Sequence, residues 1–410
     1  MNFNKPIYVF LALVLEVFAS CGGGSNPTPS NAKNITAFSF PQGTGVITDT
    51  SDTAGTIAVT VPFGTGVTGL VATYTTTGSS VAVGNTAQVS GTTPNDFTTP
   101  VTYTVTARDK TTKAYVVKVT ITPVAGDKVT FTAAGVNFKM AYVPGGLTFP
   151  IGTDDSSTAM VSHAYWIGET EVTYELWDKV RTWATTSGGY TFANNGADGS
   201  SGTGAVTEPV TIINWRDAMI WSNALTEWYN AKNGTSYTCA YYADASFTQP
   251  IRTSTNSSII TDSTPGSQDD PYVKTDATGF RMLTSNEWEL AARYKNGSSW
   301  TPGNYASGAT ADYTNASATE QVTWYSDNSG GMTHVVGTAL PNDLGLYDMS
   351  GNASEWSFDW YPGMAGSYRL IRGGDWSTNA FTLQVGCVYN GYDPYYAYDF
   401  LGFRLSRTDL

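Results

Sequence analysis

Histidine and cysteine are scarce in this sequence. Its 410 residues include two histidines, His163 and His334, and three cysteines, Cys21, Cys239 and Cys387. The histidines lie far apart in the chain, which excludes a histidine-rich iron centre. Cys239 and Cys387 could form a disulfide in an oxidising compartment. Nothing in the sequence brings the two together, so the state of this pair stays open.

Positive charge is also sparse. The chain has 21 Lys and Arg against 34 Asp and Glu, a formal net charge of −13, and its basic residues form no dense runs. Because nucleic-acid binding is driven by clustered positive charge, this composition argues against a nucleic-acid partner. Charged residues make up 13% of the chain, few for a cytosolic enzyme, whereas Gly, Thr, Ser, Asn and Tyr dominate, as in many exported β-rich proteins.

The apolar run at the N-terminus is short. Residues 7–15 follow Lys5 and have the length of the apolar part of an export signal, too short to cross a bilayer as a helix. The segment FASC, which ends at Cys21, and the Gly/Ser/Pro-rich stretch after it resemble a bacterial lipoprotein signal. We therefore expect a signal peptide over residues 1–20, lipidation of Cys21 and a flexible tether over residues 21–33. The alternative is an ordinary signal peptide with a chance cysteine.

Residues 34–124 alternate between apolar and polar side chains. The segments TIAVTV (56–61), VTYTVTA (101–107) and AYVVKVTIT (114–122) have the two-residue period of half-buried strands and are separated by Gly, Thr, Asn and Pro. Such short strands predict a small β-sandwich of immunoglobulin-like type. The stretch holds no histidine, cysteine or carboxylate cluster, so we expect a spacer domain.

Helical patterns appear only in the second part of the chain. Residues 173–184 and 214–234 carry apolar side chains at helical spacing, and the second stretch ends in a helix-terminating Asn-Gly. Another helix is expected over residues 283–294, where Thr284 and Glu287 have capping-box spacing. The remainder is rich in Gly, Asn, Ser and Tyr with little periodicity. These features predict an α+β fold with long irregular loops.

Seven segments of this second part follow one another in a set order. They are MAYVPGGLTFPIGT (140–153), YWIGETEVTYELWDKV (165–180), EPVTIINWRDAMIWSNAL (208–225), GFRMLTSNEWELAARY (279–294), LGLYDMSGNASEWSFDW (344–360), YRLIRGGDWS (368–377) and LGFRLSR (401–407). Together they resemble the formylglycine-generating enzyme (sulfatase-modifying factor) family. This resemblance implies a variant of the C-type lectin fold over residues 128–410, with much irregular structure. The whole chain would then be α+β, an immunoglobulin-like sandwich followed by this domain.

The oxidase chemistry of that family needs two cysteines shortly after the Arg-Gly-Gly block, which together hold a copper ion. The corresponding positions here are Thr378 and Leu383. Neither can supply the thiolate that monovalent copper prefers, and Cys387 lies beyond both without a nearby sulfur partner. We therefore expect no copper and no enzymatic activity. The alternative is an oxidase of the same family with a rearranged site that uses Cys387.

The family resemblance also implies a structural calcium ion. Its ligands would be the side chains of Asp348 and Glu355 with the backbone carbonyls of Gly351 and Ala353. Calcium takes six to eight oxygen ligands, so carboxylates mixed with loop carbonyls suit it. The alternative is that the two carboxylates only accept hydrogen bonds from loop amides.

The segment from about residue 375 to 400 combines many tyrosines with Asn, Asp, Ser and Thr. The same fold is used by the variable proteins of diversity-generating retroelements, whose C-terminal segment is mutated at adenines in Asn-type codons. Such changes cannot reach Lys, Glu, Gln, Met or Trp, and between Ser377 and Phe400 only Gln384 belongs to that set. The segment therefore resembles the hypermutated part of a variable protein.

Tyrosine offers a large, rigid contact area with a hydroxyl, while Ser, Asn and Gly give adaptable hydrogen bonds, the mixture that antibody paratopes favour. An aromatic core under a long loop is the alternative. Pro394 and the interleaved aspartates weigh against burial, since unpaired buried carboxylates are costly. The candidate ligand-binding residues are Asp375, Ser377, Thr378, Asn379, Phe381, Thr382, Tyr389, Asn390, Tyr392, Asp393, Tyr395, Tyr396, Tyr398, Asp399 and Phe400.

These observations predict a monomeric, non-enzymatic lipoprotein on the bacterial outer membrane or cell surface. It would bind an unknown protein or glycan through a hypervariable C-terminal face and touch the membrane only through its lipid anchor. The other candidates are the rearranged oxidase and a structural lipoprotein of the cell envelope. A neighbouring reverse transcriptase gene with a near-copy of the last segment, differing at adenines, would distinguish the first hypothesis from the others.

Overall fold

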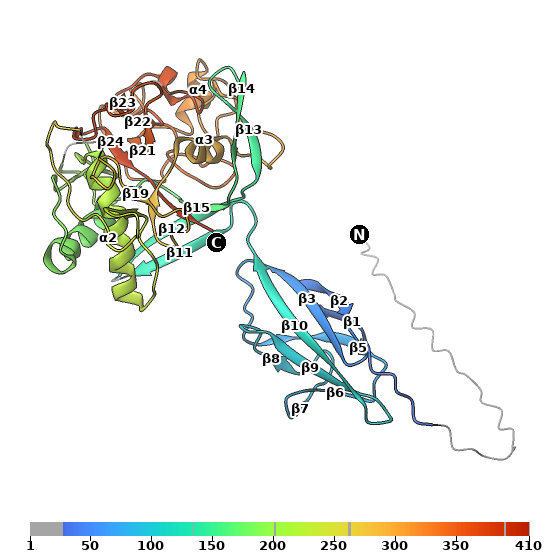
Figure 1. Cartoon of the computed structure of the whole chain (residues 1–410). Coiled ribbons are helices and arrows are strands. Elements are labelled where there is room, and N and C mark those ends of the chain that lie inside the picture. The colour runs from blue at the N-terminus through green and yellow to red at the C-terminus, as the bar shows by residue number, and fades with distance from the viewer. Residues whose placement is uncertain (1–27, 134, 201, 261–263, 389–390, 410) are drawn as a thin grey trace, which may run out of the picture. The chain divides into compact units, whose positions relative to one another are not determined.

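The computed structural model describes residues 28–409 except 134, 201, 261–263 and 389–390. The predicted signal peptide, Cys21 and most of the predicted tether lie outside the described residues. The chain divides into two compact units, Met1–Thr122 and Pro123–Leu410 (Figure 1). Within the described part of the chain, no helix is both long enough and apolar enough to cross a membrane.

The first unit is built from strands. They are β1 (Ile35–Phe40), β2 (Gly43–Asp49), β3 (Ala54–Pro62), β4 (Leu70–Val71), β5 (Thr73–Thr76), β6 (Ser80–Val83), β7 (Thr86–Ala87), β8 (Pro94–Asn95), β9 (Val101–Thr106) and β10 (Thr112–Thr122). Eight of them form one sheet in the order β5-β1-β2-β3-β10-β9-β6-β7, with a separate β4-β8 pair. The three strands predicted from alternation correspond to β3, β9 and β10, of which β3 and β10 pair in parallel.

The first unit encloses an apolar core. Along β3, every second residue from Gly55 to Val61 is buried, as the two-residue period predicts. The rings of Phe38 on β1 and Tyr103 on β9 lie 5.3 Å apart, although β2, β3 and β10 separate these two strands in the sheet. The sheet therefore folds back around a shared core. Its immunoglobulin-like type remains a prediction.

The second unit contains two larger sheets. One has the order β11-β12-β15-β25-β20 and the other the order β23-β22-β21-β24. Their strands are β11 (Lys128–Ala133), β12 (Val136–Val143), β15 (Tyr165–Gly168), β20 (Arg281–Met282), β25 (Leu405–Thr408), β21 (Ser354–Trp360), β22 (Arg369–Arg372), β23 (Gly391–Tyr392) and β24 (Leu401–Phe403). Two-stranded ribbons are formed by β13 (Leu147–Ile151) with β14 (Ser157–Val161), β16 (Ala197–Asp198) with β17 (Val210–Thr211), and β18 (Tyr241–Tyr242) with β19 (Tyr272–Val273). Because β25 pairs with both β15 and β20, the end of the chain completes a sheet that begins with the first blocks of the domain.

The three predicted helices are present. They are α1 (Tyr174–Trp183), α2 (Trp215–Asn233) and α3 (Ser285–Arg293), joined by a short α4 (Ala316–Glu320), a π-helical turn at Ala184–Gly188 and a 3-10 turn at Ala380–Leu383. The predicted capping box of α3 forms between Thr284 and Glu287. Helix α2 also has a capping box, and it ends at Gly234 in a left-handed conformation, as the Asn-Gly pair predicts.

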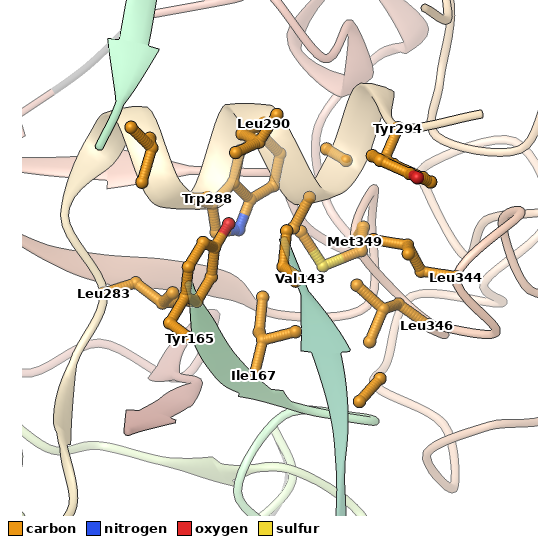
Figure 2. Close-up of a cluster of buried hydrophobic side chains, with 14 of the residues drawn as sticks. Val143, Tyr165, Ile167, Leu283, Trp288, Leu290, Tyr294, Leu344, Leu346 and Met349 are labelled. Carbon is orange, nitrogen blue, oxygen red and sulfur yellow. The ribbon is translucent and has the colours of Figure 1, made fainter. Parts of the chain in front are cut away.

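Helix α3 packs on a buried hydrophobic cluster of the second unit (Figure 2). Trp288 of α3 lies beside Tyr165 of β15, and Leu290, Ile167 and Met349 belong to the same buried cluster. The Tyr165 hydroxyl donates a 2.5 Å hydrogen bond to the carbonyl of Glu287, so the buried phenol is satisfied. Hydrogen bonds join α3 to the second large sheet: Trp288 donates to Glu355 of β21, and Arg372 of β22 donates to Ser285. Strand β22 leads into the candidate site.

Candidate ligand-binding site

Strand β22 leads into a cavity of about 180 Å³. At the turn that follows the strand, Gly373 and Gly374 have φ of 92° and 68°, which glycine adopts without strain. A Cβ on Gly374 would lie 2.8 Å from Oγ1 of Thr382, so the backbone passes close to the opposite wall. The cavity is lined by Ser354, Ile371, Arg372, Gly373, Gly374, Asp375, Ser377, Thr378, Thr382, Cys387, Tyr392 and Phe400.

Asp375 is the carboxylate of this cavity and is only 3% exposed. Its Oδ1 accepts hydrogen bonds from the backbone N–H (2.9 Å) and the hydroxyl (2.7 Å) of Ser377, and its Oδ2 accepts one from Ser354 (3.0 Å). Burial raises the pKa of Asp375, while these hydrogen bonds act in the opposite direction. Asp375 therefore shapes the turn and leaves a carboxylate at the cavity wall.

Arg372 lies at the base of the cavity and is held by several partners. Its Nη2 donates to Glu289 (2.6 Å) and to the hydroxyl of Ser285 (2.7 Å) on α3, and its Nη1 donates to the carbonyl of Cys387 (3.0 Å). Burial raises the pKa of the Cys387 thiol to about 11, so this thiol is protonated at neutral pH. A protonated thiol is a poor nucleophile.

The two positions that correspond to the copper-binding cysteines differ in their surroundings. Thr378 lines the cavity, and its Oγ1 bonds to both the backbone N–H and the carbonyl of Asp375. Leu383 is fully buried. Cys239 and Cys387 are both buried, free thiols, so the possible disulfide between them is not formed in this structure.

Five rings form a cluster beside the cavity, which we call the aromatic cluster: Tyr392, Tyr395, Tyr396, Tyr398 and Phe400. The centroids of neighbouring rings lie 5.2 Å (Tyr392–Tyr398), 4.7 Å (Tyr395–Tyr396), 5.6 Å (Tyr396–Tyr398) and 5.0 Å (Tyr398–Phe400) apart. Four of the rings are half-buried, and Tyr396 is 39% exposed. None of the five belongs to the buried hydrophobic core, although Pro394 between them is buried.

The remaining predicted residues lie around this centre. Asn379 caps the 3-10 turn by accepting a hydrogen bond from the backbone N–H of Phe381 (3.1 Å), and the Phe381 ring is 45% exposed. Asp393 and Asp399 are half-buried. Tyr389 and Asn390 lie outside the described residues. The sequence did not single out the lining residues Ser354, Ile371 and Arg372, although all three belong to the framework blocks that flank the variable segment. Cys387, which also lines the cavity, was considered only for the alternative oxidase.

The predicted calcium ligands lie in a second region. Oδ2 of Asp348 accepts a hydrogen bond from the backbone of Gly337 (2.7 Å). Both oxygens of Glu355 accept hydrogen bonds, one from Arg404 Nε and the other from Trp288 Nε1, each at 2.8 Å. Glu355 therefore already has a cationic partner, which makes it a poorer ligand for a second cation than Asp348.

Glu171, which the sequence did not single out, lies beside Asp348. Both carboxylate oxygens of Glu171 and Oδ1 of Asp348 are buried without a hydrogen-bond partner. Burial, together with the charge of Asp348, holds the pKa of Glu171 well above its usual range. The charge of Arg404 compensates this pair in part, and two neighbouring buried carboxylates fit a cation. The described residues contain no group of three or more His, Cys, Asp or Glu side chains placed to hold a metal, so carbonyl oxygens would have to complete the shell.

Comparison with known proteins identifies the second unit. Residues 128–409 match the model of the sulfatase-modifying factor enzyme 1-like domain. The chain belongs to this family. This confirms the family predicted from the seven sequence blocks, and the family accounts for the mixture of short strands, few helices and long loops. Residues 35–119 match a second model, described as SGBP, N-terminal.

Several individual proteins are similar to this chain. The Treponema denticola variable protein 1 is 29% identical, with a TM-score of 0.51 over 70% of this chain and all of that chain. CarF is 27% identical, with a TM-score of 0.52 over 67% of this chain and 99% of that chain. The chaperone protein LppX of Paenibacillus barcinonensis is 26% identical over 271 residues, 61% of this chain and 82% of LppX. The predicted resemblance to a variable protein is thus confirmed.

Proposed function

We propose that the protein is a non-enzymatic receptor that binds a ligand through the cavity at Asp375 and the aromatic cluster beside it. The observation that carries this proposal is the aromatic cluster itself, five partly exposed rings that contact one another beside the cavity. Partly exposed, rigid aromatic side chains are the anchors that recognition surfaces use. The likeness to a variable protein supports the same role.

The absence of oxidase chemistry is part of this proposal. Thr378 and Leu383 stand where the family's oxidase needs two thiolates. The thiol of Cys387 lies in the cavity, but its raised pKa keeps it protonated. The buried Arg372 beneath it is held by Glu289 and Ser285. These residues give the site architecture and leave it without an activated nucleophile.

Selection from a displayed peptide library tests the binding role. Peptides selected on the intact protein should lose binding to a Tyr395→Ser/Tyr396→Ser/Tyr398→Ser variant. They should retain binding to Tyr229→Ser, a matched control whose ring stacks on Tyr237 at 5.8 Å outside the cluster. Selected peptides that bind the triple variant and the parent equally would show that the ligand face lies elsewhere.

We further propose that lipidation of Cys21 anchors the receptor at the cell surface of a bacterium. The proposal rests on the order of apolar run, small residues and cysteine, followed by a Gly/Ser/Pro-rich tether. Expression of the full chain with labelled fatty acid should give a labelled protein, and Cys21→Ala should abolish the label. An unlabelled parent would favour an ordinary signal peptide.

The calcium ion implied by the family would be held here by Asp348 and Glu171, with the carbonyls of Gly351 and Ala353 as further ligands. The unpartnered oxygens of Glu171 and Asp348 support this assignment, while Glu355 supports the site through Arg404. When bound, the ion would neutralise the repulsion between two buried carboxylates. Because Gly351 N–H donates to the carbonyl of Gly373 (3.0 Å), this region is joined directly to the turn that forms the cavity.

A further inference from the structure

We infer that the cavity recognises a cationic group, the ammonium of a lysine or the guanidinium of an arginine side chain of a partner protein, with Asp375 as its anchor. This inference rests on the proposed binding role of the cavity and adds the chemical class of the ligand. Three observations carry it: the hydrogen-bond donors of the wall, the charge balance at the base, and the rings at the rim.

The serine and threonine hydroxyls of the cavity wall each donate their proton to an oxygen atom of the protein. Ser354 and Ser377 donate to the carboxylate of Asp375, at 3.0 and 2.7 Å. Thr378 donates to the carbonyl of Asp375 (2.9 Å), and Thr382 donates to a backbone carbonyl of its own turn (3.0 Å). A hydroxyl has one proton and two lone pairs. The wall therefore offers acceptors to a ligand and few donors.

The positive charge at the base of the cavity is balanced within the protein. Arg372 pairs with Glu289 at 2.6 Å, Glu289 also pairs with Arg293 at 2.8 Å, and Arg293 pairs with Asp155 at 2.6 Å. Two arginines thus face two carboxylates. Asp375 takes no part in these ion pairs, so its negative charge is the one that a ligand entering the cavity would meet.

The segment around the cavity adds negative charge and no positive charge. Residues 373–403 contain Asp375, Asp393 and Asp399 but no Lys, Arg or His. Asp399 is close enough to Asp375 to raise its pKa further. A cationic ligand would be attracted by this field, whereas an anionic ligand would be repelled.

Aromatic rings complete the cavity. Tyr392 and Phe400 line it, and a cation over a ring face is attracted by the ring quadrupole. The protein uses this contact internally: the guanidinium of Arg369 lies 3.7 Å from the ring centroid of Trp215 and 3.5 Å from that of Trp360. A cavity of about 180 Å³ has room for the end of one side chain, so a carboxylate and two rings would surround a single cationic group.

The test uses four capped amino acids as probes, with heteronuclear NMR titration of the folded second unit within the full chain. The probes are the N-acetyl methylamides of lysine, arginine, norleucine and glutamate. We expect the lysine and arginine probes to bind at least about tenfold more tightly than norleucine, a difference that corresponds to about 1.4 kcal/mol. Raising the salt concentration from about 50 to about 500 mM should weaken the binding of the lysine and arginine probes, because salt screens the attraction between opposite charges.

Substitutions locate the anchor. Asp375→Asn should lose most of the preference for the lysine probe, whereas Asp343→Asn, a matched change of an exposed aspartate outside the cavity, should keep it. Because Asp375 also shapes its turn, its substitution could act through the fold. Asp399→Asn and Tyr392→Leu test the site independently, and each should weaken the binding of the lysine probe.

Two results would overturn the inference. In the first, the norleucine or glutamate probe binds as tightly as the lysine probe. In the second, neither the lysine nor the arginine probe binds measurably at the highest probe concentration used. The peptide selection described above separates this failure from a failure of the proposed function. Neutral or acidic peptides that depend on the aromatic cluster would leave the receptor role intact and refute the cationic ligand. Peptides whose binding does not depend on the aromatic cluster would refute both the receptor role and the cationic ligand.

Discussion

The rings of Tyr398 and Phe400 stack 5.0 Å apart with an interplanar angle of 10°. Tyr398 also contacts the rings of Tyr392 and Tyr396, so it lies at the centre of the aromatic cluster. Its backbone carbonyl accepts a hydrogen bond from Ile212 (2.9 Å), which ties the segment to the body of the domain through the main chain. The position of these rings therefore depends partly on backbone contacts that substitutions leave in place.

Replacing three rings of the cluster should leave the domain folded. The variant Tyr392→Ser/Tyr395→Ser/Tyr398→Ser removes half-buried rings, each of which should cost about 1–2 kcal/mol, less than the roughly 3–5 kcal/mol of a core aromatic. Urea unfolding beside the parent measures the difference. A cooperative transition at a lowered midpoint is expected; its complete loss would show that the rings form a core.

The protein should not convert cysteine to formylglycine. With copper and oxygen present, a sulfatase peptide incubated with the parent should give formylglycine at background level by mass spectrometry, because Thr378 and Leu383 offer no thiolates. Cys387→Ser should give the same background. Product that appears with the parent and disappears with Cys387→Ser would instead establish the rearranged oxidase.

Calcium should raise the melting temperature, because a ligand that binds only the folded state stabilises that state. At a calcium concentration about one hundred times Kd, the free energy of unfolding should rise by about 2.7 kcal/mol. Glu171→Gln should abolish this response. In chelator, the same variant should melt no lower than the parent, because burial and, second, the charge of Asp348 disfavour a charged Glu171, and glutamine is neutral. If the calcium response persists in Glu171→Gln and is lost in Glu355→Ala, the carboxylate ligands are Asp348 and Glu355, as the family implies.

Acid should destabilise the second unit through Glu287. Burial disfavours this carboxylate, but the charge of Arg281 and hydrogen bonds from His163 and Arg281 outweigh burial and hold the pKa of Glu287 below the ordinary value of 4.5. A folded pKa below the unfolded one gives stability that is fully present above the unfolded pKa. This stability is lost progressively as the pH falls from the unfolded pKa toward the folded pKa.

Urea unfolding between about pH 3 and 7 measures this loss. Glu287→Gln should flatten the pH dependence and lower stability at neutral pH, because it removes the carboxylate partner of Arg281, whose side chain is only 11% exposed. The matched change Glu320→Gln, at an exposed position, should leave the slope unchanged. Equal slopes for the parent and Glu287→Gln would assign the acid sensitivity to other carboxylates.

The sequence by itself determined the features that depend on neighbouring residues. Period-two alternation gave the strands β3, β9 and β10, and apolar spacing with caps gave α1, α2 and α3, including the Thr284–Glu287 box. Ordered blocks were enough to identify the family because each block carries its own side-chain pattern. The composition of residues 375–400 predicted surface tyrosines, since Tyr, Asp, Ser and Asn together suit solvent better than a core. In the structure Tyr396 is exposed, whereas Tyr392, Tyr395 and Tyr398 are half-buried.

Only the tertiary structure shows which charged and polar side chains become neighbours. Glu171 and Asp348 are far apart in the chain, and so are Arg372 and Glu289 or Ser354 and Asp375. Whether a carboxylate is satisfied depends on partners that arrive from other elements, and local patterns say nothing about them. Glu355 was expected as a calcium ligand from the family resemblance, and nothing in the sequence was a reason to consider Glu171. Only packing shows that Arg404 and Trp288 donate to the oxygens of Glu355, whereas those of Glu171 accept no hydrogen bond.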